Sequence, residues 1–149
     1  MSGSSVHPLN FDPIIIGYNK ANNFGRLIEM EFEILGPGEL EYKITIAEKH
    51  LATPIAAHGG VLSTLMDSVL GISALSLFCT EGKIVSTVEM KINFLAPVFV
   101  NDRLIGRSKV LSKGKRLSVT EAEIMNQNGI VVAKGMGTFN AYPKEKAGY

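Results

Sequence analysis

The chain has 149 residues, enough for one domain, and 46% of them are hydrophobic, which suffices for a buried core. Fifteen Lys and Arg stand against 14 Asp and Glu, so the formal net charge is +1. This balance argues against a nucleic-acid-binding protein, which normally carries a strong basic excess. The single cysteine, Cys79, cannot form an internal disulfide, which suits a reducing cytoplasm, and we expect it to be a small buried residue.

Targeting signals are not evident. The first ten residues lack the basic start and the apolar stretch of a secretory signal. No uninterrupted apolar run approaches the roughly 20 residues that cross a bilayer. We therefore expect a soluble, cytoplasmic, single-domain protein over residues 1–149, with a lead-in segment over residues 1–25, a tail over residues 141–149, and no nucleic-acid or membrane partner.

The first third of the chain predicts a lead-in element followed by a hairpin. Residues 8–24 are mixed in character and predict a short helix or turn. Residues 26–35 alternate apolar and polar side chains, most clearly in their second half, as expected for a strand with one solvated face. The Gly-Pro-Gly-Glu sequence of residues 36–39 is a turn signal, and residues 40–47 alternate again, so the two segments predict a β-hairpin.

The middle of the chain predicts one long buried helix. Residues 48–58 lose periodicity, and Pro54 excludes a regular interior. From residue 59 to about residue 79 apolar side chains occupy nearly every face, and the segment contains no proline. Such a helix should be buried and roughly 30 Å long.

The remainder of the chain predicts a meander of strands. Residues 84–95, 103–111, 117–126 and 130–140 each read as a strand, with turns at residues 112–115 and 127–129. Consecutive strands with a single long helix indicate an α+β fold in which an antiparallel sheet packs on that helix.

The only candidate for a catalytic site lies between His58 and Ala74. The chain has no nucleotide-binding glycine loop, no Cys/His cluster with zinc spacing and no nucleophile elbow. Gly59 and Gly60 open the long helix, where unpaired N–H groups and the helix dipole favour negative charge, as an oxyanion site requires. Asp67 lies further along the same apolar helix, where a carboxylate is costly unless it is hydrogen-bonded or faces a cavity.

Two interpretations of these residues remain open at this point. The glycines could form an ordinary loop-to-helix junction, and Asp67 could point outward. Alternatively, Asp67 could act as a general base on water or as a carboxylate nucleophile. A thioester is a suitable target for such a carboxylate, because its carbonyl reacts without protonation of a poor leaving group.

Three segments resemble the hotdog-fold acyl-CoA thioesterases, and most closely the branch of the phenylacetate-pathway thioesterases and the thioesterase superfamily members. They are the His-Gly-Gly sequence with Asp67 in the following helix, the strand STVEMKINFLAPV at residues 86–98, and the hairpin NGIVVAKGMGTF at residues 128–139. The resemblance covers residues 27–140 in matching order. It implies a curved antiparallel sheet wrapped around the long helix, a dimer with active sites at its interface, and assembly into a tetramer as a dimer of dimers.

The resemblance also implies roles for individual residues. Asp67 would be the general base or nucleophile from one subunit, and the Gly59 N–H of the other subunit would polarise the thioester carbonyl. His58 would shape the turn, and Thr87 would help to hold the attacking water unless it is an ordinary strand residue. Gly60 and Ser68 would contact the substrate. The basic hairpin would meet the CoA phosphates unless it is only a solvated turn: it comprises Lys113, Gly114, Lys115 and Arg116.

One position departs from the pattern of the family. This branch usually has an Asn six residues before the His of the His-Gly-Gly sequence, where the amide contacts the site, and here that residue is Ala52. Thr53 or His50 could substitute, although neither occupies the family position. The predicted activity is acyl-CoA hydrolysis, with CoA as part of the substrate and no other cofactor or metal.

Two alternatives to this activity remain. A non-catalytic acyl-CoA or acyl-carrier binding protein on the same fold would account for Ala52. A hydratase or dehydratase of enoyl or hydroxyacyl thioesters typically carries an Asp/His pair at a different spacing. The acyl group itself is not predicted: an aliphatic and a small aromatic group fit equally well.

Overall fold

A helical segment precedes the sheet. The computed structural model describes residues 5–149, so residues 1–4 of the expected lead-in lie outside the described part. The segment comprises η1 (Pro8–Phe11), α1 (Pro13–Ala21) and α2 (Asn23–Leu27). Asp12 caps α1 by accepting a hydrogen bond from the Ile14 N–H, and Asn22 caps α2 by accepting one from the Gly25 N–H. The predicted short helix is therefore confirmed, as two helices.

The first strand begins later than the alternation predicted. Strand β1 spans Glu31–Gly36, whereas residues 26 and 27 end α2. The chain then turns at Glu29, which has a φ of 62°. The prediction of a strand from residue 26 was wrong because the Asn22 cap and the turn at Glu29 override a pattern that was regular only in its second half.

The remaining strands agree with the predicted meander. They are β2 (Glu39–Thr45), β3 (Lys83–Phe94), β4 (Arg103–Lys113), β5 (Leu117–Met125) and β6 (Val131–Pro143), and a final turn, η4, spans Lys144–Ala147. The strands form one six-stranded sheet in the order β1-β2-β4-β5-β6-β3, and every neighbouring pair is antiparallel. Strands β1 and β3 are thus the two edges.

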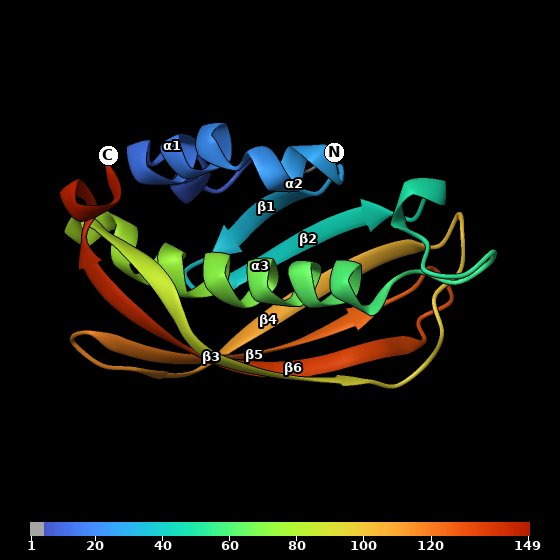
Figure 1. Cartoon of the computed structure of the whole chain (residues 1–149). Helices are drawn as coiled ribbons and strands as arrows, with labels where there is room; N and C mark the ends of the chain where they lie inside the picture. The colour runs from blue at the N-terminus through green and yellow to red at the C-terminus, as the bar shows by residue number, and fades with distance from the viewer. Residues whose placement is uncertain (1–4) are drawn as a thin grey trace.

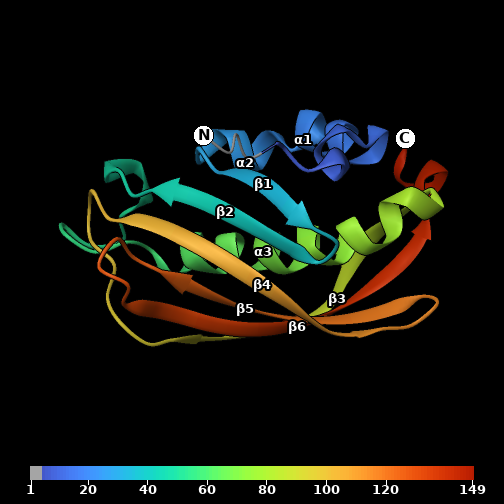
Figure 2. The same ribbon diagram turned by 180° about the vertical axis from the view of Figure 1, so that it is seen from behind.

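Helix α3 (Gly59–Phe78) forms the centre of the core. Figures 1 and 2 show the sheet curving around α3, with α1 and α2 on the side of β1 and β2. Residues of α3 that are almost fully buried include Leu65, Met66, Val69 and Leu70. The helix ends in η3 (Cys79–Glu81), followed by Gly82 with a φ of 70°. This is the predicted α+β hotdog fold, and Cys79 is buried as expected.

Two serines fasten α3 to the hairpin between β1 and β2. The Ser73 hydroxyl donates to the Gly38 carbonyl at 2.8 Å, and the Gly38 N–H donates to the Ser76 hydroxyl at 2.7 Å. Gly38 has a φ of 78°, and a Cβ there would lie 2.2 Å from a Val110 methyl group. Only glycine therefore fits this turn.

By length and composition alone, the helical stretch Gly59–Glu81 could span a membrane, with a mean hydropathy of 1.7 over its most apolar window. The sequence expectation concerned an uninterrupted apolar run, and this helix is interrupted by Asp67 and by serine and threonine residues. Of that window, 61% is buried inside the protein, as for the core helix of a globular domain.

Strand β3 contains a β-bulge that the sequence did not predict. The register with β6 shifts between Thr87 and Glu89, so Val88 is the extra residue. Thr87 pairs with the buried Phe139, and Met90 pairs with Gly137, whereas strict alternation would put Thr87 and Met90 on opposite faces. The bulge therefore turns Thr87 toward α3 without turning Met90 away from it.

Candidate active site

A hydroxyl–carboxylate pair joins α3 to β3. The Thr87 hydroxyl donates a hydrogen bond of 2.7 Å to Oδ1 of Asp67. Asp67 is half-buried and Thr87 is exposed, so the pair lies at the boundary between the core and solvent. Asp67 therefore does not point away from the sheet. A carboxylate held by one hydroxyl keeps its second oxygen available as a proton acceptor.

A cavity of about 160 Å³ opens beside this pair. Its wall combines Asp67 and Ser68 with side chains from α1, α3, β3 and β6. The other lining residues are Tyr18, Gly71, Ile72, Leu75, Ile84, Val85, Ser86, Thr87 and Phe139. A partly open space with more apolar than polar wall, beside a positioned carboxylate, is a common form of small-molecule site.

The start of α3 carries a free backbone donor. His58 is the N-cap residue, and its Nδ1 accepts a hydrogen bond of 2.7 Å from the Gly60 N–H. A Cβ at Gly60 would lie 2.8 Å from that nitrogen, so the position favours glycine. Within residues 5–149 the Gly59 N–H has no acceptor, and it lies exposed where the helix dipole favours an anion.

Asp67 and Gly59 do not converge within one chain. Eight residues of α-helix separate them, which corresponds to about 12 Å along the axis. A single thioester carbonyl therefore cannot contact the Gly59 N–H and the water at Asp67 of the same α3.

The basic hairpin lies at the opposite end of α3 from His58. The Lys113 amine lies 4.5 Å from the centre of the Phe78 ring and 3.4 Å from the Glu81 carboxylate. The Arg116 guanidinium donates to Asn140 at 2.8 Å, and the Gly114 N–H donates to the Leu117 carbonyl. In the part of the chain that the structure describes, the Lys115 amine makes no ion pair.

The loop before His58 contains no substitute for the missing amide. Ala52 lies in a tight turn in which its N–H donates to the Ala56 carbonyl. Thr53 caps the same turn through its hydroxyl. His50 is buried: its Nδ1 accepts from the Ala47 N–H, and its Nε2 lies 2.9 Å from the Ile28 carbonyl oxygen. Both side chains that could have replaced the Asn are therefore used locally.

Sequence reasoning missed the polar residues behind Asp67. Tyr18 lines the cavity, and the Asn22 amide nitrogen lies 3.4 Å from the hydroxyls of both Tyr18 and Tyr42. Burial raises the pKa of Tyr42 to about 12, and hydrogen bonds from Ser68, Asn22 and Tyr18 moderate this rise. The signal in the sequence was the spacing of Ile14, Ile15 and Tyr18, which puts them on one side of a short helix.

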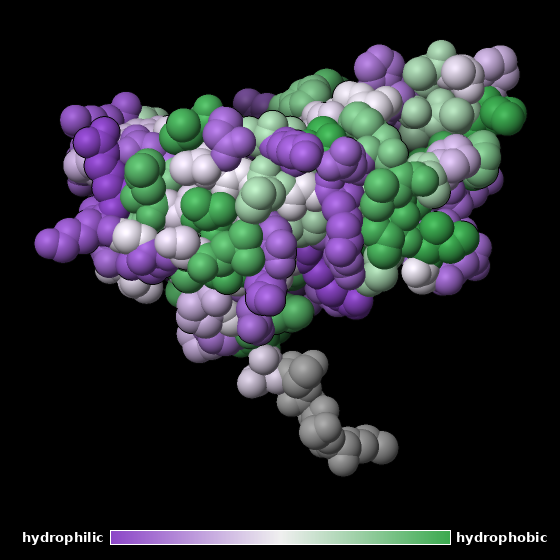
Figure 3. Space-filling view, turned by 90° about the horizontal axis from the view of Figure 1, so that it is seen from below, coloured by the Kyte–Doolittle hydropathy of each residue, from purple (hydrophilic) through white to green (hydrophobic). Residues whose placement is uncertain are grey.

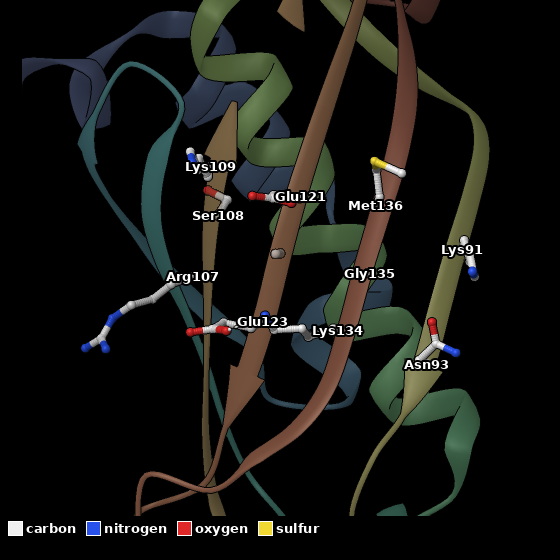
Figure 4. Close-up of a pocket in the computed structure, with 11 residues that line it drawn as sticks. Lys91, Asn93, Arg107, Ser108, Lys109, Glu121, Glu123, Lys134, Gly135 and Met136 are labelled. Carbon is white, nitrogen blue, oxygen red and sulfur yellow. Dashed lines mark ion pairs between the residues drawn. The ribbon is translucent and has the colours of Figure 1, made fainter. Parts of the chain in front are cut away.

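A larger hollow, of about 460 Å³, lies on the outer face of the sheet (Figure 4). Lysines and glutamates of β3, β4, β5 and β6 alternate in it, among them Lys91, Lys109, Glu121 and Glu123. This hollow is separated from Asp67 by the sheet and is not part of the cavity. Among residues 5–149 there is also no group of three His, Cys, Asp or Glu placed to hold a metal ion.

Comparison with known proteins identifies the family of this chain. Residues 56–133 match the family model of the thioesterase superfamily. Human acyl-coenzyme A thioesterase 13 is 30% identical over 128 residues, which cover 84% of this chain and 89% of the relative. The chain therefore belongs to the thioesterase superfamily, as the resemblance predicted, and is a thioester hydrolase.

Solved structures agree with this assignment. The E. coli PaaI protein from the phenylacetic acid degradation operon superposes with a TM-score of 0.82 at 22% identity, covering 93% of this chain and 96% of PaaI. A hypothetical thioesterase from Streptococcus pneumoniae with coenzyme A superposes with a TM-score of 0.69 at 27% identity, covering 76% and 89%. The first likeness establishes the hotdog fold.

Proposed function

We propose that this thioesterase hydrolyses short acyl-CoA thioesters with Asp67 as general base and the Gly59 N–H of the partner subunit as oxyanion donor. The observation that carries the proposal is the Thr87–Asp67 hydrogen bond of 2.7 Å at the mouth of the apolar cavity. The human relative named as an acyl-coenzyme A thioesterase and the pneumococcal structure with coenzyme A support CoA as the leaving group.

The reaction follows from the available atoms. Asp67 takes a proton from water through the oxygen that Thr87 leaves free, and the water oxygen forms a bond to the thioester carbonyl carbon. The Gly59 N–H stabilises the resulting oxyanion. The intermediate then collapses, the C–S bond breaks, and the CoA thiolate takes up the proton and leaves with the acid as the second product.

Direct attack by Asp67 is the alternative route. The carboxylate would form an anhydride with the acyl group, and water would hydrolyse it in a second step. Label in Asp67 after a single turnover in ¹⁸O-water would demonstrate the anhydride route, because the general-base route leaves the oxygens of Asp67 unlabelled. The general-base route puts ¹⁸O into the released acid, whereas the anhydride route puts ¹⁸O into Asp67 when water attacks at that carboxyl group.

A dimer would bring the two groups together. Within the described residues 5–149 the edge strand β3 has no neighbour on its outer side, and Val88 is exposed by 59% and Phe94 by 53%. An open edge of this kind favours pairing with a second copy. The exposed apolar residues Ile55, Leu95 and Phe99 lie on segments next to the start of α3. Figure 3 shows apolar groups among polar ones on the face seen from below, most densely toward one end. Two such edges paired around a two-fold axis would set Gly59 of one chain beside Asp67 of the other.

The basic hairpin fits the CoA phosphates in this arrangement. Lys115 has the uncommitted amine, while Lys113 and Arg116 are already held by Glu81 and Asn140. A phosphate group would attract Lys115 at long range, so this hairpin would govern the KM and its salt dependence rather than the chemical step. The proposed tetramer, a dimer of dimers, would enclose two pairs of such sites.

The test is CoA release from a panel of acyl-CoAs, followed with a thiol reagent. We expect Asp67→Asn to lower kcat by about 10²- to 10³-fold, the usual contribution of a general base. Glu89→Gln is the matched control, because Glu89 accepts a hydrogen bond of 2.6 Å from Thr138 on the outer face of the sheet. Wild-type rates in Asp67→Asn would exclude the proposed role, and CoA binding without hydrolysis would favour the binding-protein alternative that Ala52 suggests.

A further inference from the structure

His50 closes the base of the loop that leads into α3. The His58 N–H donates to the His50 carbonyl oxygen at 2.8 Å, and an antiparallel bridge joins the next residues inward, Leu51 and Ala57. From this base His58 passes directly into Gly59, the first residue of α3. The Gly59 N–H belongs to the planar peptide group that follows His58, so its direction depends on how the base of the loop is held.

The imidazole ring of His50 joins that base to two other segments. His50 is 1% exposed. Its Nδ1 accepts a hydrogen bond of 2.9 Å from the N–H of Ala47, just after β2, and its Nε2 lies 2.9 Å from the carbonyl oxygen of Ile28, at the end of α2. An N–H group only donates and a carbonyl oxygen only accepts, so these partners require a neutral ring with its proton on Nε2. One buried side chain therefore connects α2, β2 and the loop before α3.

The other contacts of this region do not replace the ring. The ion pair between Lys49 and Glu29, at 3.0 Å, joins the same two segments, but the side chains are 45% and 68% exposed, so solvent weakens it. The Ala57 N–H donates to the Val98 carbonyl at 2.8 Å and holds the loop against the segment after β3. An apolar side chain in place of His50 would take the acceptor from one buried backbone group and the donor from another.

We propose that His50 is a positioning residue that keeps the Gly59 N–H aimed as the oxyanion donor. The ring touches no reacting atom and acts through the backbone of His58 and Gly59. The inference rests on the proposed function, because that function assigns the oxyanion to Gly59. A misdirected donor weakens the transition state more than the bound substrate, so loss of the ring should lower kcat and leave KM nearly unchanged.

Amide side chains separate the contributions of the two ring nitrogens. His50→Asn places an oxygen near the position of Nδ1, so it keeps the acceptor for Ala47 and loses the donor to Ile28. His50→Gln places an amide nitrogen near Nε2 and does the reverse, and His50→Leu loses both contacts. The matched control is His7→Asn, because the His7 ring also accepts from a backbone N–H, that of Leu9 at 3.2 Å, but does so at η1.

The first measurement is the infrared stretching frequency of a bound carbonyl, which does not depend on turnover. The probe is butyryl-dethia-CoA with ¹³C at its carbonyl carbon, a ketone in which a CH₂ group replaces the thioester sulfur and which therefore cannot be hydrolysed. A hydrogen bond to the carbonyl oxygen weakens the C=O bond and lowers its frequency. Gly59→Pro removes the N–H and so gives the frequency of the bound probe without this donor.

We expect wild type and His7→Asn to show the lowered frequency and His50→Leu to show that of Gly59→Pro, with His50→Asn and His50→Gln between them. In steady-state kinetics on butyryl-CoA, kcat should fall in the same order at nearly constant KM. For His50→Leu the fall should be about 10- to 100-fold, less than the roughly 10²- to 10³-fold cost of a removed oxyanion donor.

Two results would overturn the inference. In the first, wild type and Gly59→Pro differ in frequency, but the His50 variants bind the probe with the wild-type frequency and keep the wild-type kcat, even where their thermal unfolding shows lower stability. If His50→Leu does not fold, the two amide variants decide this point. In the second, wild type and Gly59→Pro give the same frequency, which contradicts the oxyanion donor of the proposed function and the role of His50 with it.

Discussion

One hydroxyl, that of Thr87, orients the Asp67 carboxylate. Thr87→Val keeps the shape of the side chain and removes the donor, so the carboxylate loses a charge-assisted hydrogen bond worth about 1.5–3 kcal/mol. We expect kcat to fall roughly 10- to 100-fold while KM changes little, because the residue acts on the base and not on substrate binding. Steady-state kinetics on one acyl-CoA measures both constants.

Thr87→Ser is the matched control, since it retains the hydroxyl on a smaller side chain. Its kcat should stay within a few-fold of wild type. If Thr87→Val and Thr87→Ser are equally active, Thr87 is an ordinary strand residue and the hydrogen bond has no catalytic role.

The thiol of Cys79 should be unreactive in the native protein. Burial, with a further contribution from Asp12, raises its pKa to about 11, so only about one thiol in a thousand is ionised at pH 8. Because the thiolate is the reacting form, native protein should release almost no colour from a disulfide thiol reagent over the minutes in which unfolded protein reacts fully. Rapid reaction of the native protein would show that this end of α3 opens readily.

At the scale of elements, the start of α3 depends on the His58 cap. The ring nitrogen of His58 satisfies the Gly60 N–H, and loss of such a cap costs about 1 kcal/mol. His58→Ala should therefore lower the free energy of unfolding in urea by about that amount, whereas His58→Asn should retain most of it because Asn is a favoured N-cap residue. Equal stability of the Ala variant and wild type would contradict the capping role.

The alternation of residues predicted the strands well, and the limits of that prediction have physical causes. Strand β5 is buried on one face, so its residues alternate, and α3 is buried on nearly all faces, so its residues form an apolar run. Both patterns are visible in the sequence of one chain. The bulge at Val88 could not be predicted from the residue pattern, because it shows only in the register of β3 against β6, which brings Thr87 to Asp67 on α3. The strand predicted at residue 26 failed because local capping by Asn22 was stronger than the periodicity.

Some residues of the candidate site could be predicted from the sequence and others could not. Asp67 could be selected from the sequence because a carboxylate in an apolar helix is costly without a partner. Gly59 could be selected because glycines at the start of a helix let a ligand approach the backbone. Tyr18 could not be placed, because its position beside Asp67 depends on how α1 packs over α3 and β3. The position of the basic hairpin at the far end of α3 could not be predicted either. It depends on the order of the strands in the sheet, and the alternation of residues within each strand carries no information about that order.

At the scale of the whole molecule, dimerisation is part of the catalytic proposal, and mixing two inactive variants tests it. Asp67→Asn removes the base, and Gly59→Pro removes the oxyanion donor. Proline suits the first position of a helix, and His58 before it is already extended, with φ −67° and ψ 134°. Each homodimer should therefore fold and be inactive.

A site shared across the interface predicts recovery of activity after subunit exchange. In a mixed dimer one site carries both substitutions, and the other combines an intact Asp67 with an intact Gly59. Random exchange of equal amounts should restore about a quarter of the wild-type sites in a two-fold symmetric dimer. A double variant carrying both substitutions on one chain, mixed with Glu89→Gln, provides the control: its mixed dimers have no fully intact site, so activity comes only from the Glu89→Gln homodimers. If the two single variants recover no activity although exchange is verified by mass spectrometry, the base and the oxyanion donor do not act across the interface.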